Sequence, residues 1–226
     1  MFTALNYHHG KVLPTNDFVK GANNSGNPIG KYQSLSIKIG WQNPGYTNWQ
    51  KIYRGPCYGL GFFVGDFYNA HEIGYPLSVY GFYGIPVVRF NRFELYSEFQ
   101  YGIAWNWQHY DSTSNPHNIA IGSGLTVHLD VGLTMNYSIS DRLNVAFGYS
   151  FSHFSNGGFE RPNRGFNLIA PSIQVKYYSR DKPDYKNIGR PPKDLKKYDD
   201  VNFMLEYGDH QMVEHELDTN FFRFRV

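Results

Sequence analysis

The feature that most constrains this chain is an alternation of large apolar residues with small or polar ones, sustained over 10 to 16 residues at a time. The clearest segment places Leu, Val, Met, Tyr or Ile at every odd position from 125 to 139, with small or polar residues between. A period of two is the pattern of a β-strand with two different faces. Because strands of globular proteins are usually about 5–6 residues long, these segments predict an unusual sheet.

Two architectures are compatible with long two-faced strands. A soluble β-sandwich turns the apolar face inward, whereas a transmembrane β-barrel turns it toward lipid and needs about 9–11 residues per strand. The polar face here carries Glu94, Glu98 and Asp130, and tryptophans cluster at a strand end at Trp105 and Trp107. Strand length, the contrast between the faces and this aromatic clustering favour the barrel.

Composition excludes several other classes of protein. Aromatic residues make up 18% of the chain, yet the mean hydropathy is −0.50 and no run of about 20 apolar residues occurs, so a helical membrane protein is not expected. A net charge of +2 argues against a nucleic-acid binder. The single cysteine, Cys57, excludes an internal disulfide and a cysteine-based metal site.

Turn and loop signals divide the pattern into an even number of strands, as a closed barrel requires. Phe90-Asn-Arg and Ser140-Asp-Arg predict tight turns, which are periplasmic in outer-membrane barrels, whereas 106–118 and 157–165 predict long extracellular loops. We therefore expect an all-β, antiparallel transmembrane barrel of about eight strands at 3–13, 33–42, 57–67, 76–90, 92–107, 119–140, 142–156 and 166–178.

Charge density changes abruptly after the last expected strand. The first 178 residues contain 21 charged residues, whereas the last 48 contain 19. This difference predicts a barrel over 1–178 and a charged linker and extension of unknown role over 179–226, with strand-like pieces at Val201 to Tyr207 and Phe221 to Val226. The amino terminus lacks the basic start and apolar run of a signal peptide, so for an exported protein we expect a mature form.

Two polar residues interrupt the apolar face of the strand expected at 142–156. His153 and Ser155 continue the outward series that runs through Phe151, and polar groups facing hydrocarbon are costly unless they are satisfied. Their i, i+2 spacing would let an imidazole reach a serine hydroxyl, as in a nucleophile and base pair. If Ser155 pairs with Asn167, the amide lies diagonally from His153 and could orient it. Alternatively, the two residues merely mark the headgroup boundary.

The segment His153-Phe-Ser-Asn-Gly-Gly, followed by Pro162-Asn-Arg-Gly165, resembles the outer-membrane lipid A 3-O-deacylase family. The family's pattern is His-x-Ser-Asn, then Pro-Asn-x-Gly, then an acidic residue, and the likeness is sharpest over 140–178. The resemblance implies an eight-stranded barrel with a hydrolase site open to lipid. It also implies the following roles: Ser155 as nucleophile, His153 as general base, Asn156 in the oxyanion hole, and Asn163 and Gly165 as loop support.

This sequence departs from that pattern at Asn167, which stands where the family has its acidic residue. An amide can hold the imidazole in one tautomer, but it does not stabilise an imidazolium by charge. Three alternatives follow: Asn167 orients His153 through its carbonyl, Glu160 takes the place of the acidic residue, or the protein is slow or inactive. Arg161 and Arg164 are candidates to bind the phosphates of lipid A, or are ordinary loop arginines.

We therefore expect a serine-type esterase of the bacterial outer membrane that acts on lipid A of lipopolysaccharide and needs no metal or other cofactor. The alternatives are an inactive barrel with a structural or transport role and, less favoured, a soluble sugar- or lipid-binding β-sandwich. Acyl-chain length and oligomeric state are left open by the sequence.

Overall fold

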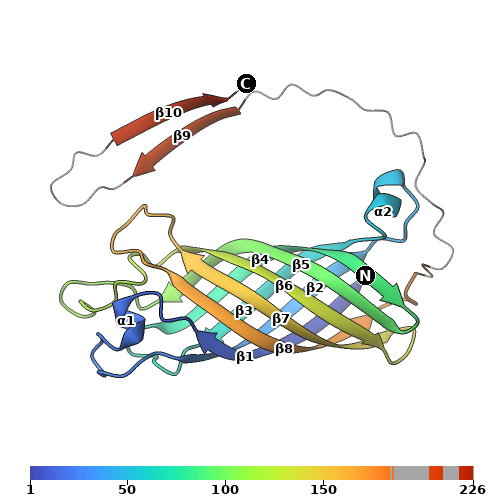
Figure 1. The fold of residues 1–226 in the computed structure, drawn as a ribbon, viewed down its shortest axis with the longest axis horizontal. Helices are drawn as coiled ribbons and strands as arrows, with labels where there is room; N and C mark the ends of the chain where they lie inside the picture. The colour runs from blue at the N-terminus through green and yellow to red at the C-terminus, as the bar shows by residue number, and fades with distance from the viewer. Residues whose placement is uncertain (184, 186–203, 211–218, 226) are drawn as a thin grey trace.

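Eight antiparallel strands close into a barrel in the computed structural model, which describes residues 1–183, 185, 204–210 and 219–225 (Figure 1). Each strand pairs with its sequence neighbours, and β1 pairs with β8 to close the sheet. The expected all-β barrel is thus confirmed. The strands are β1 (Phe2–Val12), β2 (Lys31–Gln42), β3 (Cys57–Asp66), β4 (Gly74–Phe90), β5 (Phe93–Trp107), β6 (Thr126–Ser138), β7 (Leu143–Ser155) and β8 (Phe166–Tyr178).

Seven of the eight expected strands match the structure to within two residues at each end, but the range 119–140 was wrong. β6 begins only at Thr126, because the preceding residues form a loop held by Asn118. The Oδ1 atom of Asn118 accepts hydrogen bonds from the backbone N–H groups of Ala120 and Ile121, at 3.2 and 3.1 Å. Two short helices also interrupt the loops, α1 (Asp17–Lys20) and α2 (Asn48–Ile52). No helix in the described part of the chain is long and apolar enough to cross a membrane.

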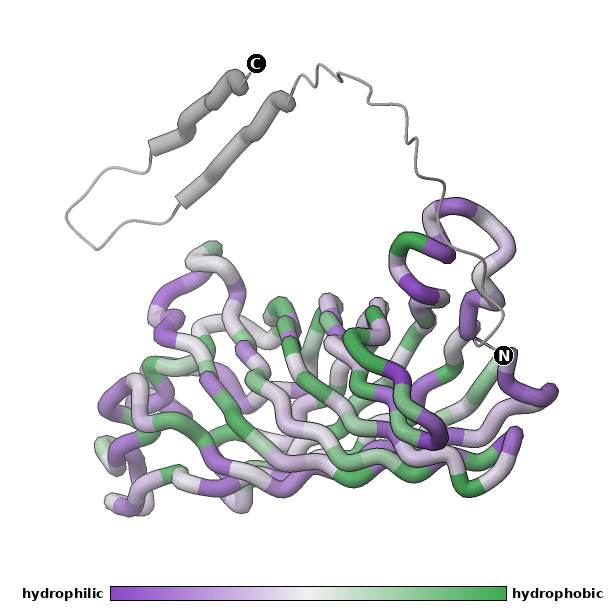
Figure 2. The backbone as a smooth tube through the Cα atoms, turned by 45° about the vertical axis from the view of Figure 1, so that its right-hand side comes forward, coloured by the Kyte–Doolittle hydropathy of each residue, from purple (hydrophilic) through white to green (hydrophobic). Residues whose placement is uncertain are grey.

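The outer surface of the barrel is apolar because the alternating side chains point to opposite sides of the sheet. Val131, Leu133 and Met135 of β6 are each about half exposed, while Asp130 and Asn136, which flank this series, are buried in the interior. Hydrophilic residues gather in the connections at both ends of the barrel (Figure 2). This inversion of the usual soluble pattern is the one that a lipid environment favours.

The interior of the barrel is filled by side chains. Lys38 of β2 forms an ion pair with Glu98 of β5 across the lumen, and Gln100 donates a hydrogen bond to Glu98 at 2.9 Å. Nearer one end, the rings of His128 and Phe154 stack with centroids 4.4 Å apart. An interior filled in this way is typical of a barrel of eight strands, which is just wide enough for its side chains to fill.

The two ends of the barrel differ in their connections. We call the end with the tight turns at 91–92 and 139–142 the turn end, and the end with the connections 13–30, 67–73, 108–125 and 156–165 the loop end. The connection 43–56, which contains α2, is a long exception at the turn end (Figure 1).

The first residues after the barrel contact its turn end. Lys182 Nζ donates hydrogen bonds to Glu94 Oε2 at 2.9 Å and to Ser138 Oγ at 2.8 Å, and the Tyr185 hydroxyl donates to the carbonyl of Asn43 at 2.9 Å. Further along, β9 (Met204–His210) and β10 (Thr219–Arg225) form a separate antiparallel pair. The domain boundary near Ser179 stays a prediction, and most of the charged linker lies outside the described residues.

Candidate active site

His153 and Ser155 lie on the outer face of β7, at the loop end of the barrel. Both side chains are partly buried, whereas the intervening Phe154 is completely buried and points inward. On the β6 side, His153 is paired with Leu129 and Ser155 with Val127. Two polar groups with hydrogen-bonding capacity therefore lie side by side on a surface that is otherwise apolar.

Asn167 of β8 lies directly opposite His153 and not diagonally from it, so the expected pairing with Ser155 was wrong by two residues. The last pair between β7 and β8 is Phe154 with Phe166, because the chain leaves the ladder at Ser155 to form the loop 156–165. A shift of two residues keeps every side chain on its expected face. It also brings Nδ1 of His153 to 2.7 Å from Oδ1 of Asn167.

The hydrogen bonds of Asn167 indicate which ring nitrogen of His153 carries the hydrogen. Its Nδ2 atom donates to Oγ1 of Thr15 at 3.0 Å, so its Oδ1 atom is the end that faces His153. A carbonyl oxygen only accepts hydrogen bonds, and Nδ1 of His153 therefore carries hydrogen. The remaining ring nitrogen, Nε2, is then unprotonated in the neutral imidazole and can accept a proton.

Gly165 packs against both polar residues of β7. Its φ angle is +71°, and a Cβ atom at this position would lie 2.9 Å from Cε1 of His153 and 3.5 Å from Cβ of Ser155. The backbone of Gly165 is held in turn by its N–H, which donates to the carbonyl of Ala120 at 2.8 Å. Glycine is thus required here both for the left-handed backbone and for the close approach of the imidazole.

Asn156 organises the loop that follows the site. Its side chain is buried, and its Nδ2 atom donates to the carbonyl of Glu160 at 2.8 Å and to Oγ of Ser123 at 3.1 Å. Its backbone N–H donates to Oδ1 of Asn163 at 3.1 Å. Asn163 therefore supports this loop. For Asn156 to bind an oxyanion, either its Nδ2 or its backbone N–H would have to leave its present acceptor.

The charged residues of the loop lie farther out. The side chains of Glu160, Arg161 and Arg164 are exposed, and Glu160 contacts Asn156 through its backbone carbonyl. Nδ1 of His153 forms its hydrogen bond with Asn167 and not with Glu160. In the described part of the chain, no group of three or more His, Cys, Asp or Glu residues is arranged to hold a metal ion.

Comparison with known proteins assigns the chain to a family. The family model of the lipid A 3-O-deacylases (PagL) matches residues 35–176, which include His153, Ser155, Asn163, Gly165 and Asn167. The chain belongs to the lipid A 3-O-deacylase family. No curated protein matches its sequence.

Two solved structures resemble this deacylase-family barrel. Neisserial surface protein A matches with a TM-score of 0.51 and 11% identity, over 78% of this chain and 95% of that protein. The outer membrane enzyme PagL matches with a TM-score of 0.47 and 14% identity, over 77% of this chain and 99% of that one. At such low identity the likeness to surface protein A shows the fold alone, that of an outer-membrane β-barrel.

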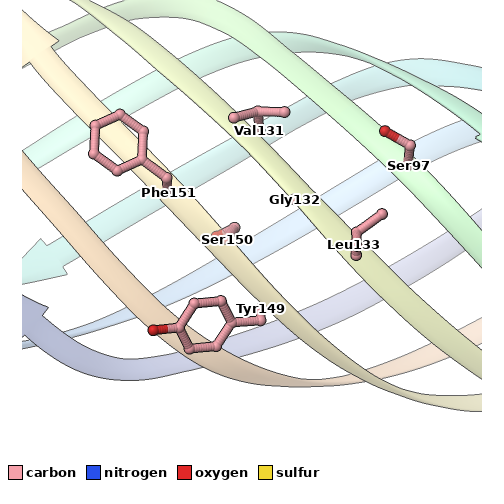
Figure 3. Close-up of a pocket in the computed structure, with 7 residues that line it drawn as sticks. All are labelled: Ser97, Val131, Gly132, Leu133, Tyr149, Ser150 and Phe151. Atoms are coloured by element: carbon pink, nitrogen blue, oxygen red, sulfur yellow. The ribbon is translucent and has the colours of Figure 1, made fainter.

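A hollow that the sequence did not reveal lies on the outer face of this deacylase-family barrel, below the polar pair. Its volume is about 300 Å³, and its walls are mainly apolar. Phe151, at one edge, is the outward residue of β7 that precedes His153, and the small side chain of Ser97 leaves the space open. Figure 3 shows the lining residues Ser97, Val131, Gly132, Leu133, Tyr149, Ser150 and Phe151.

Proposed function

We propose that this protein hydrolyses the ester bond that joins a 3-hydroxyacyl chain to lipid A in the outer leaflet of the bacterial outer membrane. The observation that carries the proposal is the outward-facing His153, whose Nδ1 lies 2.7 Å from Oδ1 of Asn167, with Ser155 two residues further along the same face of β7. This contact supports Nε2 of His153 as the proposed base. Family membership supplies the reaction class, and the position of the pair on the outer face is accessible to a lipid from the side.

In the proposed reaction, Ser155 is the nucleophile and His153 the general acid and base. Oγ of Ser155 attacks the ester carbonyl while Nε2 of His153 takes its proton, and the same proton then passes to the departing sugar oxygen. Water next attacks the acyl carbonyl while Nε2 of His153 takes its proton, and this proton passes to Oγ of Ser155 as the acyl–Oγ bond breaks and the fatty acid is released. Asn156 is proposed as an oxyanion donor, with Arg161 and Arg164 near the lipid A phosphates. No metal or cofactor is needed.

We further propose that the hollow below the site holds the acyl chain of the substrate. Ser150, at its floor, is five residues along β7 from Ser155, a distance of about 17 Å at roughly 3.4 Å per residue. A chain whose carbonyl lies at Ser155 would therefore extend along apolar residues toward the middle of the membrane.

The proposed function is tested by expressing the protein in a Gram-negative host that lacks a lipid A deacylase. We expect the mass spectrum of the host's lipid A to show the loss of one 3-hydroxyacyl group. Heat-dependent gel mobility in detergent confirms that the barrel is folded. A folded barrel with unchanged lipid A would favour the alternative of a non-hydrolytic, structural protein.

Substituting Gly165→Ala should reduce hydrolysis by about 100-fold, because the new methyl group displaces the imidazole and misplacement by about 1 Å carries a cost of this size. The matched control is Gly157→Ala. Gly157 has a similar φ of +70°, but the nearest atom to a Cβ there is 3.9 Å away. Rates of ester hydrolysis by the two purified variants separate the clash from backbone strain, and equal losses would contradict the assigned contact.

Substituting Ser97→Phe should fill the hollow with an aromatic ring. Because only long acyl chains reach the hollow, the hydrolysis of long-chain esters should slow at least tenfold more than that of short-chain esters. Ile37→Phe, which places the same ring on the outer face of β2, is the control. The measurement is kcat/KM for a series of acyl esters in detergent. Equal loss for short and long chains would show that the chain lies elsewhere.

A further inference from the structure

A segment of the first loop, residues 13–16, is attached to the beginning of β8 by three hydrogen bonds. The backbone N–H of Leu13 donates to the carbonyl of Asn167 at 2.8 Å, and Nδ2 of Asn16 donates to the carbonyl of Gly165 at 3.1 Å. The third bond joins Nδ2 of Asn167 to Oγ1 of Thr15 at 3.0 Å. The first loop thus reaches the candidate site across the seam where β1 closes on β8.

The Thr15 hydroxyl is oriented to accept this third bond. Oγ1 lies 3.5 Å from the backbone carbonyl oxygen of Leu13, which is the acceptor for its single hydrogen. A hydroxyl has one hydrogen and two acceptor lone pairs, so Oγ1 still has a lone pair for the amide of Asn167. Asn16 stabilises this segment, because its Oδ1 accepts from the N–H of Val19 at 3.0 Å and caps α1.

This contact matters because an asparagine side chain has two different ends of nearly the same shape. With Oδ1 toward His153, the imidazole carries hydrogen on Nδ1, and Nε2 is the base. If the amide rotated by half a turn, Nδ2 would donate to Nδ1, hydrogen would move to Nε2, and the base would be lost. A carboxylate has two equivalent oxygens, so an acidic residue at position 167 would not need this orientation.

We propose that Thr15 is a positioning residue that fixes the orientation of the Asn167 amide and, through it, the tautomer of His153. The proposal deepens the proposed function, on which its effect on catalysis rests. It assigns a role to a residue 152 positions away from Asn167. It also accounts for how an amide serves here without the charge of a carboxylate.

The test compares Thr15→Val, which keeps the shape but removes the hydroxyl, in two backgrounds. With Asn167 present, we expect kcat for ester hydrolysis to fall about five- to tenfold with little change in KM, the loss that one hydrogen bond corresponds to. In the Asn167→Asp background, the same change should alter kcat less than twofold. Thr15→Ser should retain the parent rate. Equal losses in both backgrounds, or no loss in either, would overturn the proposal.

A second measurement reports the tautomer of His153 directly and does not depend on enzyme activity. The ¹⁵N shifts of the His153 ring in detergent micelles should report hydrogen on Nδ1 in the parent and in Asn16→Ser, which keeps a capping residue and the Thr15 contact. Thr15→Val should show a mixture of tautomers. An unchanged Nδ1–H tautomer in Thr15→Val would refute the positioning role. A protein that shows the expected tautomers but leaves lipid A intact would instead refute the proposed function alone.

Discussion

Replacing Ser155 with alanine is expected to abolish the release of 3-hydroxyacyl chains from lipid A. Without the Oγ atom no acyl-enzyme forms, and loss of the nucleophile in a serine hydrolase typically lowers kcat by about 10⁶-fold. His153→Ala should have an effect of similar size, because the two residues act as one unit in the proposed mechanism. The mass spectrum of lipid A from cells expressing either variant should match that of cells without the protein.

Ser152→Ala is the matched control for this result. Ser152 lies three residues earlier on β7 but faces the lumen, where its hydroxyl donates to Asp130 Oδ2 at 2.5 Å. Its removal deletes the same group from the opposite face of the same strand, so deacylation should continue. Full deacylation by a folded Ser155→Ala variant would show that the nucleophile lies elsewhere.

The faces of the barrel were predictable because alternation is a local property. The odd positions of β6 and β7 point outward in the structure as the sequence indicates, which placed His153 and Ser155 on the outer face. The beginning of β6 was not predictable in this way. Residues 119–125 contain apolar side chains that continue the pattern, but Ala120 and Ile121 are buried residues of a loop that Asn118 holds.

The contacts between strands were less predictable than the faces. Asn167 was expected to lie diagonally from His153, with Glu160 as the alternative partner, whereas the structure places Asn167 directly opposite. This register depends on how many residues the loop 156–165 takes up, and that depends on the hydrogen bonds of Asn156. Thr15 offers no local signal, because its contact with Asn167 exists only after β1 closes on β8. Likewise, the hollow arises where the small Ser97 of β5 lies beside larger outward residues of β6 and β7, which come together only in the folded sheet.

Asn167→Asp is expected to raise kcat by at least tenfold. Asp has the shape of Asn, so a carboxylate oxygen would take the place of Oδ1 at 2.7 Å from His153 Nδ1 and stabilise the imidazolium that forms during proton transfer. The reverse change, from acid to amide, costs about 10⁴-fold in kcat in a serine protease, which sets an upper limit on the gain. Asn167→Glu, which introduces the larger acid, should also raise kcat. The measurement is ester hydrolysis by purified variants in detergent.

The pH dependence separates a charge effect from repacking. A carboxylate contributes only while ionised, so the gain in Asn167→Asp should be full at neutral pH and disappear as the pH falls through the pKa of the new acid, about 4 for an unperturbed aspartate. Asn27→Asp, which adds the same charge to an exposed loop at the same end of the barrel, should leave kcat unchanged. If Asn167→Asp leaves the rate unaltered at every pH, the imidazolium must be stabilised by another group, and Glu160→Gln becomes the variant to measure.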